Sequence, residues 1–505
     1  MEALLNNFIL VGSIILLISV LLSKSSSRFG LPILIIFMVV GILAGSEGLG
    51  GIQFENYELT HSLSLVALCL IIFSGGIETD LKDVKTHLVR GALLSSVGVI
   101  ITTVVVGAFA HFILKLAYLE SLLLGAILSA TDAAAVFAVF KDKKAQVIAR
   151  DKNLLKFESG SNDPMAYFLV TVILGLIDSS NVSGLNIGIN FFLNPLIGLL
   201  VGIILSKAFI SLNNIINLEF IGLYPALTLS FLFMNYSIAG QLGGNGFLAI
   251  YVFGILISSK KILHKTLLYS FYDGISWLSQ IGMFVMLGLL VFPSRLINIA
   301  PQGILIALFL IFIARPIAIF ICLAFSSFNF KDKTFISWAG LKGATPIVFA
   351  SFAAVKMGDK AYFLFDAVFF VVLVSALLQG MTLKFVARKM GLLYEAIEDP
   401  SFPVDFEVLE KTKNGIKEVA IEESDFAVGR RVVDLNLPTG SLVLFIKREG
   451  AFIIPDGSTI FNNKDRILVV TMSKNDIEKA IECFKVGKEA VEEVNLATAE
   501  IITKS

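Results

Sequence analysis

The chain has 505 residues, of which 56% are hydrophobic and only 16% are charged, and its formal net charge is zero. A soluble protein of this length does not have so apolar a composition, whereas several apolar stretches reach the roughly 20 residues that span a bilayer. The neutral balance gives no electrostatic footprint for nucleic acid, and the three cysteines lack the spacing of a zinc site or a disulfide framework. A polytopic α-helical membrane protein is predicted, without a nucleic-acid partner.

Thirteen apolar stretches predict membrane-spanning helices. The start of the chain, MEALLNN, lacks the basic region of a signal peptide, so the first stretch is interpreted as a membrane helix. Residues 236–247 could form a loop or a bent helix, and an even number of spans would move the C-terminus across the membrane. The predicted spans are 4–22, 30–45, 60–77, 88–113, 120–140, 157–177, 190–211, 219–237, 246–258, 275–292, 302–325, 334–355 and 361–386.

Lysine and arginine residues are concentrated in every second predicted loop, most densely in residues 141–156. Because cytoplasmic loops carry the excess of basic residues, this bias places the N-terminus outside and the C-terminus in the cytoplasm. The opposite side holds few basic residues, namely Lys115, Arg295, Lys356 and Lys360.

Polar side chains cluster in the sixth predicted span, in the sequence FESGSNDPMAYF. Carboxylates are expensive in lipid, so Glu158 and Asp163 are functional candidates by default. On a helix, Glu158 lies one turn from Asn162, and Ser159 lies one turn from Asp163. Pro164 cannot donate its share of the helical hydrogen bonds, which frees a carbonyl oxygen. The span therefore offers oxygen ligands for a desolvated cation.

Two basic residues, Arg315 and Lys342, lie inside predicted spans and need a counter-charge or a wet cavity. Two glycines and a proline surround Lys342 in the twelfth span and predict an interrupted helix, which is tolerated only where it lines protein or a cavity. The fifth span carries Thr131 and Asp132 at its middle. If spans 1–6 and 8–13 are two repeats, spans 5 and 12 correspond, as expected of a transporter's midplane site.

The composition changes after Met390, where a small cytoplasmic α+β domain is predicted. Asn414-Gly415 is typical of a tight hairpin turn, three further strands follow between residues 441 and 470, and Ser473 could cap a closing helix. The predicted division is a membrane domain 1–390, a linker 391–403, the cytoplasmic domain 404–485 and a tail 486–505.

Four motifs carry a family resemblance: SATDAAAVFAVF, FESGSNDPMA, IARPIAI and GLKGATPIVFAS. In this order they resemble the monovalent cation/proton antiporters of the sodium/proton exchanger superfamily. The bacterial NhaP-type K⁺/H⁺ antiporters with a C-terminal TrkA-C (RCK_C) domain are the most similar branch, since residues 429–469 are similar to that domain. The resemblance implies an NhaA-like fold with inverted repeats, in which the interrupted helices of spans 5 and 12 cross, and a homodimer.

The resemblance also implies the roles of individual residues. Asp163 is similar to the family's ion-binding and proton-carrying carboxylate, and Asn162 to its partner. Thr131 and Asp132 match the unwound helix, and a monovalent cation is expected at Asp163, Thr131 and Ser159. Two departures are notable, because Lys342 replaces the family's usual arginine and Ser74 replaces an aspartate. The supporting residues are Glu158, Ser159, Lys342 and Arg315.

Two of these roles remain open from the residues alone. Asp132 either ligates the ion or permanently balances helix dipoles and Lys342. Glu158 is interpreted as a structural anion paired with a basic residue such as Arg315, rather than as a direct ligand. With Asn162 in place of a second aspartate, exchange of one cation for one proton at Asp163 would be electroneutral.

The predicted function is exchange of K⁺ or Na⁺ for H⁺ across a bacterial inner membrane, with membrane lipid as the surroundings and no cofactor beyond the transported ions. The cytoplasmic domain is expected to regulate transport, and it could bind a nucleotide. A cation channel gated by this domain is the alternative, but a repeated carbonyl filter such as TVGYG is absent. An intramembrane enzyme is not expected, since no HExxH or paired catalytic aspartate motif occurs.

Overall fold

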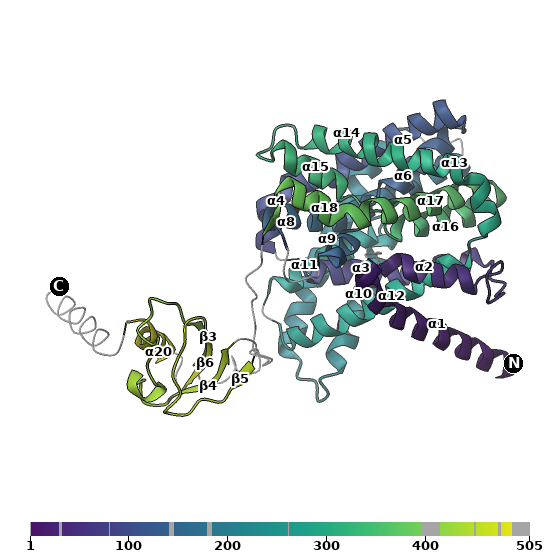
Figure 1. Ribbon diagram of the computed structural model, residues 1–505. Helices are drawn as coiled ribbons and strands as arrows, with labels where there is room; N and C mark the ends of the chain where they lie inside the picture. Colours follow the sequence, from purple (N-terminus) through teal and green to yellow (C-terminus); the bar gives the residue numbers. More distant parts are fainter. Residues whose placement is uncertain are drawn as a thin grey trace. The chain divides into compact units, whose positions relative to one another are not determined.

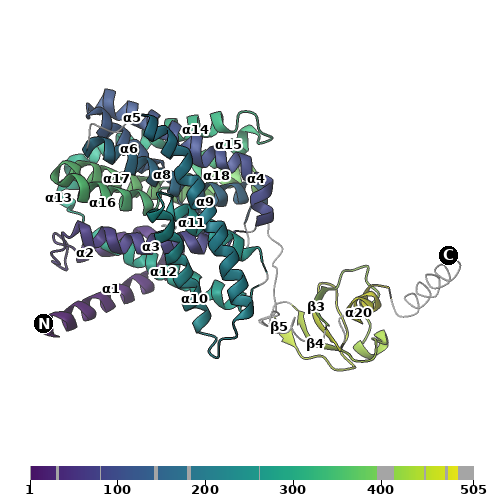
Figure 2. The same cartoon turned by 180° about the vertical axis from the view of Figure 1, so that it is seen from behind.

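The computed structural model describes residues 2–29, 33–79, 81–140, 146–178, 184–260, 262–394, 415–448, 451–472 and 476–486. The chain forms two compact units, Met1–Glu398 and Asp399–Ser505. Figures 1 and 2 show the helical first unit from opposite sides, with its helices sorted into two bundles.

The first bundle is held together by α12, which packs on α2 and α3, and by α11, which packs on α3, α9 and α10. These helices lie together in both views. The first bundle consists of α1 (Glu2–Phe29), α2 (Ile33–Ala44), α3 (Tyr57–Ile77), α9 (Gly184–Ile215), α10 (Leu223–Gln241), α11 (Gly246–Ser258) and α12 (Lys265–Leu289).

The second bundle contains two interrupted helices, α6/α7 and α15/α16, and packs chiefly through α5 on α6, α6 on α8 and α13 on α17. Three of its helices contain a π-helical turn, η1 (Leu94–Gly98), η2 (Leu310–Ala314) and η4 (Ala376–Gly380), and a 3-10 turn, η3 (Gly358–Ala361), precedes α17. Its α-helices are α4 (Leu81–Leu93), α5 (Val99–Leu114), α6 (Tyr118–Ser129), α7 (Ala133–Val139), α8 (Ala149–Asp178), α13 (Pro293–Phe309), α14 (Arg315–Cys322), α15 (Phe330–Trp338), α16 (Thr345–Met357), α17 (Tyr362–Ser375) and α18 (Met381–Met390).

Each predicted span falls mainly on one of these helices or on an interrupted pair. Among the described residues, six helices are long and apolar enough to cross a membrane on their own, so the total of thirteen spans stays a prediction. Helix α12 begins at Lys265 rather than at 275, because Lys265, Ser270 and Asp273 interrupt the apolar pattern of its first turns. In the stretch 236–247, α10 continues to Gln241, a short turn follows at residues 242–245, and α11 begins at Gly246.

The second unit is a four-stranded antiparallel sheet in the order β3-β6-β4-β5, packed against one helix. The three strands predicted between residues 441 and 470 and the closing helix are confirmed. Several predicted features lie outside the described residues. They are the first arm of the predicted hairpin together with Asn414, the cap residue Ser473, residues 395–403 of the linker and residues 487–505 of the tail. The elements are β3 (Gly415–Ala420), η5 (Val432–Leu435), β4 (Ser441–Arg448), β5 (Ala451–Ile453), β6 (Arg466–Thr471) and α20 (Asp476–Lys485).

The predicted linker is not wholly a linker. Its first residues belong to the first unit, where β2 (Leu393–Tyr394) pairs antiparallel with β1 (Gln146–Val147), the short strand that precedes α8. Gly391 ends α18 in a left-handed conformation (φ 73°), which turns the chain toward β1. The backbone pairing could not be predicted from composition, since it joins segments far apart in the chain.

Helices α2 and α12 approach each other at Gly41 and Gly288. A Cβ atom on Gly288 would lie 2.4 Å from the Met38 carbonyl oxygen, and one on Gly41 would lie 2.2 Å from the Val285 carbonyl oxygen. Small residues that let helix backbones meet are a common way to pack membrane helices, where the hydrophobic effect gives little help.

This contact predicts that Gly288→Ala destabilises the protein. A methyl group there must push α2 and α12 apart, so we expect a loss of about 1–3 kcal/mol and a lower thermal unfolding midpoint in detergent. Gly282→Ala is the matched control on the same helix, because a Cβ atom there meets no atom within 4 Å. Equal midpoints for the two variants would contradict the close packing.

Candidate ion-binding site

The two interrupted helices of the second bundle meet at their breaks. Helix α6 ends at Ser129 and α7 starts at Ala133, while α15 ends at Trp338 and α16 starts at Thr345. The backbone N–H of Asp132 donates to the Leu341 carbonyl at 2.9 Å, so the two extended breaks are joined by a main-chain hydrogen bond. The interruptions predicted in spans 5 and 12 are present, and they lie against each other.

Opposite charges sit at the two ends of the first break. The Lys342 ammonium donates to the Ala130 carbonyl at 3.0 Å and contacts the Ser129 carbonyl at 3.5 Å, at the C-terminal end of α6. Asp132 accepts from the Ala135 N–H at 3.0 Å and so caps the N-terminus of α7. Each charge has the sign that stabilises its helix end. Lys342 is only 3% exposed.

Helix α8 lays its polar face against this crossing. The Ser159 hydroxyl donates to the Thr131 carbonyl at 2.9 Å and accepts from the Ala133 N–H at 2.9 Å, so it bridges the break. The Asn162 amide donates to the Thr131 hydroxyl at 2.5 Å. Both side chains satisfy backbone or hydroxyl groups that the interruption leaves without helical partners.

Asp163 is held at one carboxylate oxygen and left available at the other. Its Oδ2 accepts from the Thr345 hydroxyl at 3.0 Å, at the start of α16. Among the described residues, its Oδ1 and the Oδ1 of Asn162 are buried without a hydrogen-bond partner. A buried carboxylate oxygen in this state calls for a proton or a cation.

A cavity of about 110 Å³ opens beside this group. Four predicted site residues line it: Thr131, Asp132, Ser159 and Asp163. The other four predicted residues, Asn162, Glu158, Lys342 and Arg315, are not among its lining residues. The structure thus separates residues that face the cavity from residues that hold the frame behind it.

Glu158 and Arg315 form the predicted ion pair. Their closest oxygen and nitrogen atoms are 2.6 Å apart, and the side chains are only 1% and 5% exposed. Arg315 begins α14 directly after the π-helical turn η2, and Gly340 makes room for it, since a Cβ there would lie 2.5 Å from the Arg315 Nε. The pair therefore lies beside the second break, and neither residue lines the cavity.

Sequence reasoning missed three residues that complete the site. Thr345 holds Asp163, Asn245 donates to the Pro164 carbonyl at 2.7 Å, and Tyr251 packs its ring on Gly160. The first could have been sought beside the break in the twelfth span. The other two come from the first bundle, and nothing in their local sequence points to α8. Pro164 does not break α8, which continues as a helix to Asp178.

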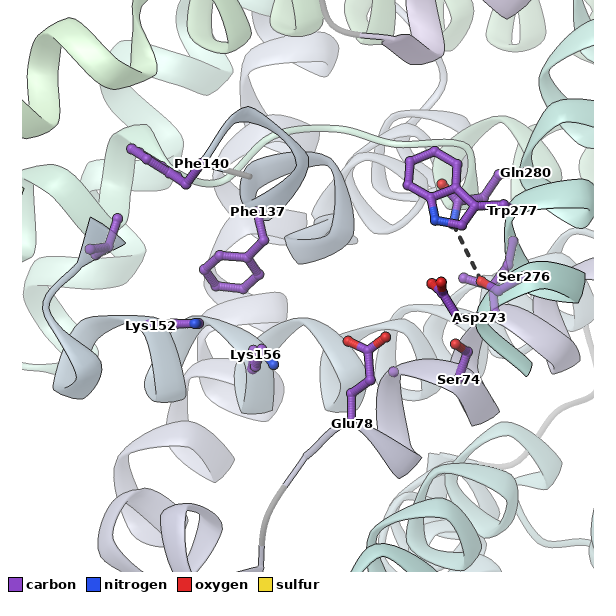
Figure 3. Close-up of a pocket in the computed structure, with 13 residues that line it drawn as sticks. Ser74, Glu78, Phe137, Phe140, Lys152, Lys156, Asp273, Ser276, Trp277 and Gln280 are labelled. Carbon is purple, nitrogen blue, oxygen red and sulfur yellow. Dashed lines mark hydrogen bonds between the residues drawn. The ribbon is translucent and has the colours of Figure 1, made fainter. Parts of the chain in front are cut away.

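A wider pocket of about 330 Å³ adjoins the cavity, and six residues line both. Figure 3 shows this pocket, with Lys152 and Lys156 along α8 and the Glu78 carboxylate turned into the space. Its other charged residue is Asp273, at the polar start of α12. The residues shared by both pockets are Ile71, Gly75, Glu78, Phe137, Lys156 and Gln280.

Known proteins match almost the whole chain. The family described as sodium/hydrogen exchanger, transmembrane, matches residues 13–389, and the TrkA-C domain matches residues 416–485. The chain is 36% identical over 476 residues to the K⁺/H⁺ antiporter NhaP of Alkalimonas amylolytica, covering 93% of this chain and 82% of that protein. It is 37% identical over 477 residues to the K⁺/H⁺ antiporter NhaP2 of Shewanella oneidensis, with the same coverage.

A more distant curated relative and a solved structure also match the chain, and the solved structure shares its fold. The Na⁺/H⁺ antiporter ApNhaP of Aphanothece halophytica is 26% identical over 405 residues, covering 77% of this chain and 75% of that protein. The solved structure of the sodium proton antiporter MjNhaP1 from Methanocaldococcus jannaschii at pH 8 has a TM-score of 0.68 at 24% identity, covering 77% of this chain and 99% of that one.

The buried ion pair predicts that neutralising one of its two residues lowers the stability of the protein more than neutralising both. Glu158→Gln leaves the Arg315 guanidinium buried without its partner, so we expect a loss of about 3–5 kcal/mol in detergent unfolding experiments. The double variant Glu158→Gln, Arg315→Gln removes both charges and should recover most of that loss. A double variant no more stable than the single one would argue against the pair.

Proposed function

Since the chain belongs to the sodium/hydrogen exchanger family, whose members are transporters and not enzymes, we propose that it exchanges cytoplasmic K⁺ for H⁺ at Asp163. The observation that carries this proposal is the buried Asp163 Oδ1, which has no hydrogen-bond partner in the described part of the chain and whose side chain lines a cavity with Thr131 and Ser159. Hydroxyl, carbonyl and carboxylate oxygens suit a monovalent cation, and the same carboxylate accepts a proton.

The exchange follows from one carboxylate serving two ions. With Asp163 ionised, a cation entering the cavity neutralises it and gains Thr131 and Ser159 as oxygen ligands. After the cation leaves on the other side, a proton takes its place, because a bare carboxylate is poorly stabilised away from water. If the second bundle moves against the first only when the site is neutral, each cation out is matched by one proton in. This is alternating access.

The other charged residues around Asp163 support an electroneutral stoichiometry, because each has a partner of its own. Glu158 is paired with Arg315, and Asp132 and Lys342 are engaged at the ends of the broken helix. Asn162 contributes no charge, so Asp163 is the one carboxylate at the cavity for which we propose a change of charge during the cycle. One cation then exchanges for one proton.

The preference for K⁺ is drawn from relatives. Two relatives named K⁺/H⁺ antiporters match 93% of the chain, whereas the Na⁺/H⁺ antiporter of Aphanothece halophytica is more distant. Na⁺ as the main ion is the alternative, because the proposed oxygen ligands accept both. We further propose a homodimer in a bacterial inner membrane, with the N-terminus outside. Its cytoplasmic TrkA-C domain would regulate transport, with a nucleotide as the proposed class of ligand.

The site assignment predicts that Asp163→Asn abolishes exchange. Inverted vesicles with an acid interior should lose their pH gradient when K⁺ is added, if they contain the unsubstituted protein. Vesicles with the variant should keep the gradient, because a neutral amide cannot exchange a bound cation for a bound proton. Asp178→Asn is the matched control, an exposed acid at the end of the same helix. Titration with K⁺, Na⁺, Rb⁺ and Li⁺ ranks the ions. A fully active Asp163→Asn variant would refute the assignment.

The stoichiometry predicts that transport carries no net current. In voltage-clamped membranes, the cation-dependent proton flux should proceed at a rate that does not change with membrane potential. A current that scales with turnover would overturn the one-to-one exchange. A current without coupled proton movement would instead indicate a channel.

A further inference from the structure

Six residues line both pockets, and the place where they lie is called the neck here. The neck carries opposite charges from the two bundles. Glu78 directly follows α3 of the first bundle, and Lys156 lies on α8 of the second bundle; both line both pockets. Lys152, one turn earlier on α8, and Asp273 line only the wider pocket. A cation that travels from the wider pocket to Asp163 therefore passes Lys156.

The Lys156 ammonium lies beside the Phe137 ring. Its nitrogen is 5.8 Å from the centroid of that ring, which also lines both pockets. Cation–π contacts extend to about 6 Å, so the ring is one of the groups that keep the ammonium among the residues shared by the two pockets. Lys156 and Asp163 are two helical turns apart on nearly the same face of α8, about 10 Å along the axis.

We propose that Lys156 is a tethered cation that competes with the transported cation on the path to Asp163, and so sets the cation concentration required for transport. This inference rests on the proposed antiport. A positive charge on a residue roughly 10 Å from Asp163 along the axis of α8 disfavours a second cation there, and Glu78 on the facing bundle attracts whichever of the two is nearer. Lys156 thus determines apparent affinity without ligating the ion.

The charge pair also links affinity to the position of the bundles. Because Glu78 and Lys156 belong to different bundles, a shift of one bundle against the other changes their separation. Such a shift therefore changes how strongly the residues shared by the two pockets attract a cation. A barrier of this kind would slow the export of the cation when the cytoplasmic concentration of that cation is low.

The test is the effect of Lys156→Met on the KM for K⁺, measured in inverted vesicles at alkaline pH, where protons compete least. Methionine keeps the length of the side chain and removes its charge. We expect the KM to fall about three- to tenfold, from the Coulomb interaction of two unit charges at this distance, with the maximal rate within about twofold. Lys156→Arg keeps the charge and should keep the KM of the unsubstituted protein.

Lys152→Met is the matched control, since it removes the same charge one helical turn further from the cavity. Because salt screens the charge over this longer distance, we expect the KM to change less than twofold. An unchanged or higher KM in Lys156→Met, or a collapse of its maximal rate alone, overturns the inference. If that variant does not fold, Lys156→Gln makes the same comparison. Absence of K⁺-dependent exchange in the unsubstituted protein would instead refute the proposed antiport itself.

Discussion

The structure depends on how the two interrupted helices of the first unit satisfy the backbone groups at their breaks. An interruption exposes backbone groups that lipid cannot satisfy. Here the Asp132 N–H bonds to the Leu341 carbonyl, the Lys342 ammonium contacts the last carbonyls of α6, and Asp132 caps α7. The two breaks therefore satisfy each other, with opposite charges on opposite helix ends. The cavity beside Asp163 is therefore bordered by two breaks whose backbone groups are satisfied.

The periodicity of α8 then divides its polar residues between two tasks. Glu158 and Asn162 lie one turn apart and face the frame, where they meet Arg315 and Thr131. Ser159 and Asp163 occupy the neighbouring stripe and line the cavity. One helix thus carries both the scaffold and the ion-binding group, so a movement of α8 would carry both together.

The local pattern of α8 could be predicted from sequence, and so could the interruptions around Asp132 and Lys342, because helical spacing and clusters of glycine and proline are local signals. The Glu158–Arg315 pair could be predicted because a membrane-embedded charge requires a partner. Thr345 could have been sought beside the second break, but Asn245 and Tyr251 could not, since each acts on α8 from the other bundle. The β1–β2 pairing is hidden for the same reason, because two-residue strands leave no periodicity.

The position of Lys342 gives a physical account of why lysine suits this place in the chain. A guanidinium is a planar fork matched to a carboxylate, whereas an ammonium is a compact point charge with three rotatable donors. The partners found here are the successive carbonyls of Ser129 and Ala130 at the end of α6. The first belongs to the last residue of α6 and the second to the extended residue that follows it, and one compact ammonium reaches both. Lys342 therefore stabilises the end of α6, and the substitution of arginine by lysine keeps the property that this helix end uses.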